Sequence, residues 1–263
     1  MLLSEEVWVK ISLLPADNCV EGRAKTGGID VKVIGVSEKG QVRANNEDSF
    51  YCSQDNQLLI VADGMGGHVG GEVASAISVR TIVSFFDSQP VSAQTLTQAF
   101  TQANEAVYNY AASHPDLKGM GTTLTAVSVL DQQLLVGHIG DSRACLLDNN
   151  GLEWITSDHS VSGQLLEMGK ISHSEAETHP QRHVLTQVLG TEAAIEPDVF
   201  NIPWQPGQFL LLCTDGLSDV VNEQEIHSAV MADSDLDIKK DRLLKLVAHR
   251  GAPDNVTFIL AEL

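Results

Sequence analysis

Five short motifs place acidic side chains beside glycine, asparagine or other small residues. They are Asn46-Glu47-Asp48, Asp63-Gly64-Met65-Gly66-Gly67, Gly140-Asp141-Ser142-Arg143, Thr214-Asp215-Gly216 and Asp254-Asn255. Most of them stand at one end of an apolar, strand-like run, so a fold that joins strand ends can bring the acids together. Carboxylates that share a pocket repel one another and raise one another's pKa unless cations neutralise them. The motifs therefore indicate a metal site.

The chemistry of these ligands selects the ion. Oxygen atoms from carboxylates and carbonyl groups prefer hard cations, so Mg²⁺ or Mn²⁺ is expected rather than zinc or iron. The four cysteines are far apart and form no Cys-x-x-Cys pair, so the sequence suggests neither a zinc knuckle nor a small disulfide framework. His179 and His183 have the spacing of a zinc pair, but Pro180 follows the first and no third ligand completes the pattern, so surface or packing roles are expected. Gly-x-Ser-x-Gly, Cys-x₅-Arg and Walker motifs are absent from the sequence.

Strand-like runs are the elements that must position the acids. Seven stretches rich in β-branched or apolar residues, bounded by Gly, Asp or Asn, are predicted to be strands: 30–36, 57–62, 122–130, 133–139, 143–147, 208–213 and 256–260. Asp131-Gln132 predicts a tight hairpin between two of them, and residues 148–151 predict another turn. Short strands joined by tight turns favour antiparallel pairing.

Helical periodicity appears in three places. Apolar residues recur at helical spacing over 79–86, from Ser92 onward, and around 243–247, where Gly251 and Pro253 end the helix. Their apolar stripes are expected to pack on a sheet. Helices segregated from hairpin-rich strands indicate an α+β fold rather than a doubly wound parallel sheet.

Composition limits the class of protein. With 263 residues and 43% hydrophobic content, the chain can bury one large core, and a single catalytic domain is expected. The net charge of −19 disfavours binding to nucleic acid and to anionic membrane surfaces. The first residues lack a signal-like pattern, and the separated cysteines suggest free thiols in a reducing compartment. We therefore expect a soluble, cytoplasmic protein, and a monomer.

The order of the motifs resembles the metal-dependent protein serine/threonine phosphatases of the PPM or PP2C family, in their bacterial form. The resemblance runs from about Asp30 to Glu262 and rests on residues 43–49, 61–68, 121–123, 140–143 and the stretch from Asp158-His159-Ser160 through His179-Pro180 to 185–190. The family implies a β-sandwich of two antiparallel sheets with helices outside each sheet and a metal cleft at one edge. It also implies a catalytic domain over 30–263. Residues 1–29 match nothing and form an N-terminal extension of unknown role, either a peripheral strand or a loosely ordered arm.

The resemblance also assigns metal ligands. Two Mn²⁺ or Mg²⁺ ions are implied, with a weaker third. Asp63 bridges the first two ions, Asp215 and Asp254 complete the first, Glu47 and the carbonyl of Gly64 hold the second, and Asp141 shares the third with Asp215. Each late Asp has a structural alternative as a turn or helix N-cap residue, and Asp141 could instead pair with Arg143 in a hairpin.

Three residues are assigned to catalysis. Arg43 matches the phosphate-binding arginine of the family, although a surface arginine is the alternative, and Asp48 is implied to orient coordinated water. His68 either assists near the phosphate or caps the following helix. The general acid of the animal branch is a histidine directly after the Asp-Gly pair, and this chain has Met65 there, so the proton donor stays open.

The function implied by the resemblance is hydrolysis of phosphoserine and phosphothreonine in proteins by a water molecule that two metal ions activate. The expected partners are phosphorylated proteins and a Ser/Thr protein kinase that the enzyme opposes in signalling. Two other functions stay open. The chain could be an inactive, phosphoprotein-binding relative, which should have lost the metal set that is complete here. It could instead hydrolyse small phosphate esters, and only analogy with the family favours protein substrates.

Overall fold

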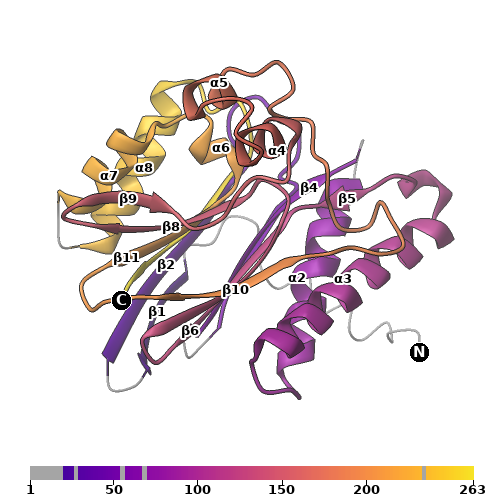
Figure 1. Ribbon diagram of the computed structural model, residues 1–263, viewed down its shortest axis with the longest axis horizontal. Helices are drawn as coiled ribbons and strands as arrows, with labels where there is room; N and C mark the ends of the chain where they lie inside the picture. The colour runs from indigo at the N-terminus through magenta and orange to yellow at the C-terminus, as the bar shows by residue number, and fades with distance from the viewer. Residues whose placement is uncertain (1–19, 27–28, 54–56, 67–69, 233–234) are drawn as a thin grey trace.

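Two antiparallel sheets face each other in the computed structural model, which describes residues 20–26, 29–53, 57–66, 70–232 and 235–263 (Figure 1). The first sheet has the spatial order β1 (Val20–Thr26), β2 (Ile29–Glu38), β12 (Val256–Glu262), β11 (Phe209–Cys213), β8 (Arg143–Asp148) and β9 (Gly151–Trp154). The second has the order β10 (Asp198–Pro203), β7 (Gln133–Ile139), β6 (Leu124–Leu130), β4 (Leu58–Met65) and β3 (Asp48–Cys52), and β5 (Gly121–Thr122) pairs with β4. The α+β sandwich predicted from the sequence is confirmed.

The side chains of the central strands alternate between the two faces of their sheet and so form an inner and an outer apolar layer. In β11, Leu210 faces the other sheet and Leu211 packs on the outer face of its own sheet. In β4, Leu59 faces inward and Ile60 outward. Successive side chains of a strand point to opposite faces, so an uninterrupted apolar run fills both an inner and an outer layer.

Helices cover both outer faces (Figure 1). The helices α2 (Gly70–Phe86) and α3 (Ala93–Ser113) pack on the second sheet, and α7 (Glu223–Met231) and α8 (Leu236–His249) pack on the first. Ser92 is the N-cap of α3, and its hydroxyl accepts a hydrogen bond from the backbone N–H of Thr95. Gly251, with φ of 88°, follows the end of α8. Both helix ends lie where the sequence predicted them.

Shorter elements complete the fold. The segment from Asp158 to Leu189 carries α4 (Val161–Glu167) and α5 (His173–Glu177), a 3₁₀ turn spans Pro115–Leu117, and α6 (Asp215–Ser218) directly follows β11. Among the described residues we find no helix with the length and apolar character needed to span a bilayer.

The predicted strands are all present, but the sequence analysis missed others. It did not predict β1, β3, β9 and β10, or the helices α4 to α7. The run predicted over 122–130 is divided at Thr123 into β5 and β6. At this break the backbone N–H of Thr123 donates to Asp63 O at 2.9 Å, and Thr123 Oγ1 accepts from the backbone N–H of Asp63 at 2.8 Å. The interruption thus fixes the backbone at one of the acids.

Candidate metal centre

Two acids stand opposite each other at the ends of neighbouring strands. Asp48 begins β3 and is paired in register with Asp63 of β4. Asp63 lies two residues after Val61, whose side chain faces the other sheet, so Asp63 and its partner point into the end of the sandwich. Burial is the largest cause that raises the pKa of both carboxyls, to about 7 for Asp48 and well above the usual value for Asp63.

Asp215 reaches the same place from the first sheet. It is the first residue of α6, one residue beyond the N-cap Thr214. The side chains of Asp63 and Asp215 interact in a way that raises the pKa of Asp63, and Thr214 Oγ1 donates a hydrogen bond to Asp48 Oδ2 at 3.0 Å. Burial also raises the pKa of Asp215. The three acids share one pocket, in which they cannot all be charged without a cation.

Two oxygen atoms of this pocket lack a donor. Within the described part of the chain, Asp48 Oδ1 and Asp215 Oδ1 are buried and accept no hydrogen bond. A buried polar atom without a partner is costly, and a cation at this position removes the cost. Because the donor atoms are carboxylate oxygens, the pocket fits a hard divalent cation such as Mn²⁺ or Mg²⁺.

Two glycines bring Glu47 against the backbone of Gly64. A Cβ at Gly71 would lie 2.5 Å from Gly64 O and 2.7 Å from Glu47 Oε2, so these two oxygens border the space that the glycine leaves open. A Cβ at Gly64 would lie 2.1 Å from Gly71 O. Neither position has room for a side chain, and the backbones approach closely for that reason. Glu47 and the Gly64 carbonyl thus lie side by side, as a shared ion would require.

Arg43 and Asp254 form an ion pair at the mouth of the site. Arg43 Nη2 lies 2.6 Å from Asp254 Oδ2, and the two side chains are 52% and 29% exposed. The hydrogen bond to Asp254 is the largest cause that raises the pKa of Arg43. An ion pair this exposed contributes little to stability. The guanidinium can therefore leave Asp254 for another anion at small cost.

Asp141 lies on the turn between β7 and β8. Burial raises the pKa of its carboxyl to about 8, and the nearby charge of Asp215 acts in the same direction. Arg143 binds Asp158 with two hydrogen bonds, Nε to Oδ1 at 2.7 Å and Nη2 to Oδ2 at 2.6 Å. This fork fixes Arg143 on the residue that opens the 158–189 segment. The structural alternative for Asp141, a hairpin ion pair with Arg143, is therefore not the pairing observed.

Comparisons with known proteins decide the family. The family model for protein phosphatase 2C matches residues 38–244. A serine/threonine phosphatase of Listeria welshimeri is 37% identical over 236 residues, which cover 86% of this chain and 93% of that protein. The chain belongs to the protein phosphatase 2C family. The family and the enzyme class predicted from the sequence, a metal-dependent protein serine/threonine phosphatase, are confirmed.

Solved phosphatases of this family share the fold. Stp1 of Staphylococcus aureus has a TM-score of 0.83 at 35% identity, with 93% of this chain and 99% of that chain covered. A PstP catalytic domain was solved in complex with two manganese ions, and it has a TM-score of 0.79 at 36% identity, with coverage of 88% and 97%. The ion in that relative agrees with the Mn²⁺ or Mg²⁺ expected from the sequence.

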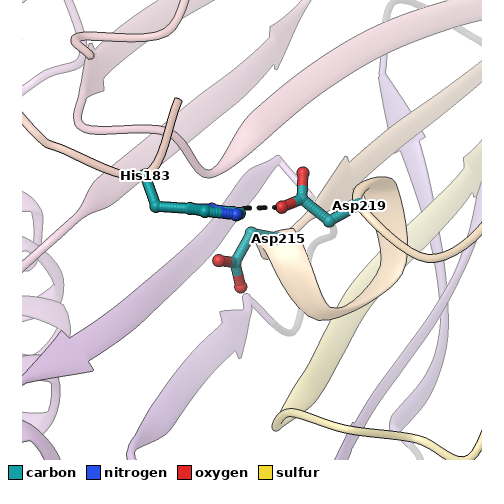
Figure 2. A group of neighbouring side chains, drawn as sticks. All are labelled: His183, Asp215 and Asp219. Atoms are coloured by element: carbon teal, nitrogen blue, oxygen red, sulfur yellow. Dashed lines mark ion pairs between the residues drawn. The ribbon is translucent and has the colours of Figure 1, made fainter. Parts of the chain in front are cut away.

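The phosphatase structure adds two residues that the sequence analysis did not place at the site. Figure 2 shows His183 and Asp219 beside Asp215, and one ligand atom from each residue lies within 4.8 Å of the other two. His183 Nδ1 is 3.3 Å from Asp219 Oδ2. Asp219 follows Asp215 by four residues, a spacing that puts both carboxylates on one side of a helical turn. Recognising Thr214-Asp215 as a helix start would have identified Asp219.

A cleft of about 710 Å³ opens from these residues. Its wall includes Asp141, Asp215 and residues of the α4–α5 segment. Trp154 and Arg250 also line it. The acids are therefore reached through a groove large enough for a short stretch of polypeptide.

One predicted site residue cannot be placed. His68 lies outside the described residues, as do residues 1–19 and 27–28 of the N-terminal extension. The described part of that extension, β1, pairs with β2 at the edge of the first sheet. The remaining predicted residues, at positions 43, 47, 48, 63, 64, 141, 215 and 254, all lie within the described chain.

Proposed function

We propose that this phosphatase hydrolyses phosphoserine and phosphothreonine in proteins with two Mn²⁺ or Mg²⁺ ions and a weaker third. The observation that carries the proposal is the pair of buried oxygens without a donor, on Asp48 and Asp215, in a pocket of carboxylates. The proposed ligands are those of the sequence analysis. They are Asp63, Asp215 and Asp254 for the first ion, Asp63, Glu47 and the Gly64 carbonyl for the second, and Asp141 with Asp215 for the third.

When bound, the ions supply positive charge that lowers the pKa of water and neutralises phosphoryl oxygens. The protein's own residues do the remaining work. Thr214 holds the Asp48 carboxylate through Oδ2, which leaves Oδ1 free to orient water. The fork of Arg43 suits two oxygens of a phosphate, and the exposed pair with Asp254 is easily exchanged for it. The cleft beside Asp141 admits a segment of the substrate protein.

The proposed partners are phosphorylated proteins and the Ser/Thr kinase that modifies them. The net charge of −19 disfavours binding to nucleic acid and to anionic membranes, and this supports proteins as the partners. We place its action in the cytoplasm, with residues 30–263 as the catalytic domain and residues 1–29 as an extension of unknown role. Cys145 and Cys213 are fully buried and form no disulfide, which is compatible with that compartment.

The test is steady-state kinetics of Arg43→Ala on a phosphothreonine peptide with saturating Mn²⁺. A hydrogen bond to a charged group contributes about 1.5–3 kcal/mol, so KM should rise by roughly 10- to 150-fold while kcat changes less. Lys118→Ala, which removes an exposed cation on a turn after α3, is the control and should leave KM unchanged. Metal content is measured in parallel. An Arg43 variant with normal KM would show that another group binds the phosphate.

A further inference from the structure

Two segments that lie more than 200 residues apart in the sequence are fastened together at the metal centre. Residues 39–47 carry Arg43 and Glu47, and residues 252–255 carry Asp254. The backbone N–H of Gln41 donates to Ala252 O at 2.9 Å, and a Cβ at Gly40 would lie 2.2 Å from Asp254 O. The backbone of the first segment therefore rests directly on the second.

Asn255 makes the largest number of these connections. Its Oδ1 accepts from the backbone N–H of Glu47 at 2.9 Å, and its Nδ2 donates to Lys39 O and to Asn45 O, each at 2.9 Å. Both N–H groups of the side-chain amide are thus used on one segment, and the residue is 6% exposed. The three bonds bracket Arg43 in the sequence, since they reach residues on either side of it.

The backbone of Asn255 connects to the acids. Its N–H donates to Asp254 Oδ1 at 2.8 Å, which orients the carboxylate that pairs with Arg43. Its carbonyl oxygen would lie 1.8 Å from a Cβ at Gly216, so it packs directly on the residue after Asp215. Asn255 therefore lies between two of the acids and the segment with the phosphate-binding arginine.

We propose that Asn255 is a positioning residue that holds Arg43 in its place for phosphate. The inference rests on the proposed function, because Arg43 is the group through which Asn255 acts. The side-chain bonds of the 39–47 segment also include Asn46 Nδ2 to Ser37 Oγ, Arg43 to Asp254 and Ser75 Oγ to Glu47 O. A buried amide with three backbone partners is the kind of contact that fixes a loop rigidly. Without it, Arg43 keeps its charge but loses its fixed direction.

The experiment compares Asn255→Ala and Asn255→Asp with Arg43→Ala in the Mn²⁺-loaded enzyme. Asn255→Asp keeps an acceptor for Glu47 N–H but turns a carboxylate toward the carbonyls of Lys39 and Asn45. Both Asn255 variants should raise KM for a phosphothreonine peptide by about tenfold or more, with a smaller change in kcat. Amide hydrogen exchange in residues 39–47 should become faster in both.

Asn104→Ala is the matched control. Asn104 is also a buried asparagine with two backbone partners, since its Oδ1 accepts from Gly190 N–H at 2.8 Å and its Nδ2 donates to Glu192 O at 2.9 Å. This variant should lower the melting temperature as the Asn255 variants do, yet leave KM unchanged. A purely structural role for Asn255 would make the three variants behave alike, and that result would overturn the inference.

The double variant Asn255→Ala/Arg43→Ala separates the two proposals. If Asn255 acts through Arg43, the double variant should have a KM close to that of Arg43→Ala alone. KM effects that multiply independently would overturn the inference while leaving the role of Arg43 intact. A normal KM in Arg43→Ala would instead refute the proposed phosphate site, and the positioning role with it.

Discussion

Removal of the metal should make the stability of this phosphatase fall as the pH rises from 6.5 to 8. A carboxyl with a higher pKa in the folded state keeps a proton there that the unfolded chain has already lost, so the free energy of unfolding decreases until the folded pKa is passed. Burial raises the pKa of Asp63 well above its usual range and that of Asp141 to about 8. Asp141 therefore keeps at least half of its proton up to about pH 8 in the folded, metal-free protein, and the shift of Asp63 acts in the same direction.

The magnitude follows from the number of protons held. One proton changes the free energy of unfolding by about 1.4 kcal/mol per pH unit, so Asp141, which keeps most of its proton over the window, contributes up to about 2 kcal/mol. The window begins at 6.5 because burial lowers the pKa of His138 to about 4. Below its usual pKa that histidine makes stability rise with pH and would mask the effect.

The assay is urea unfolding in EDTA at several pH values, followed by tryptophan fluorescence, to which the buried Trp204 contributes. Saturating Mn²⁺ should abolish the fall, because ions take the place of the protons and bind only the folded state. Asp141→Asn should flatten the profile in EDTA, whereas Asp116→Asn, on the exposed turn after α3, should not. Stability in EDTA that is constant or rises over this range would refute the account of the buried acids.

Further outcomes concern the ligands themselves. Activity on p-nitrophenyl phosphate should vanish in EDTA and return with Mn²⁺, and full activity in chelator would contradict the metal assignment. Asp63→Asn and Asp215→Asn should abolish turnover with the fold retained by circular dichroism, whereas Asp141→Ala should lower turnover and leave two ions in Mn²⁺-soaked crystals. Gly64→Ala should greatly reduce the yield of folded enzyme or its Mn²⁺ affinity, because a Cβ there would lie 2.1 Å from Gly71 O; normal folding and binding would show that the two backbones can separate.

The sequence predicts those strands whose own residues form a continuous apolar run. Buried strands such as β11 and β4 are apolar throughout, and that signal survives without tertiary information. In contrast, β3 reads Asp-Ser-Phe-Tyr-Cys and β10 reads Asp-Val-Phe-Asn-Ile-Pro, and neither is a continuous apolar run. Both are outermost in the main order of the second sheet, and pairing with β4 or β7 makes them strands.

Local motifs predict which acids form the metal site, but they do not predict which residues orient those acids by hydrogen bonds. The metal ligands stand out because glycine or asparagine accompanies each acid. The partners that orient them are ordinary residues, such as Thr123 beneath Asp63 and Thr214 beside Asp48, which no local pattern distinguishes. His183 is similar, since only the path of the 158–189 segment brings it to Asp215. Those contacts depend on the closed sandwich and cannot be predicted from spacing in the chain.

The strand order sets when the catalytic centre can exist during synthesis. β12 comes after every other described strand along the chain, yet it lies between β2 and β11 in the middle of the first sheet. Until it emerges from the ribosome, β2 has no partner on that side and Asp254 is missing from the site. Pairings of such long sequence separation form slowly, because much of the chain must be ordered before they do. The nascent protein should therefore remain without a metal centre until β12 has been synthesised and has paired with β2 and β11.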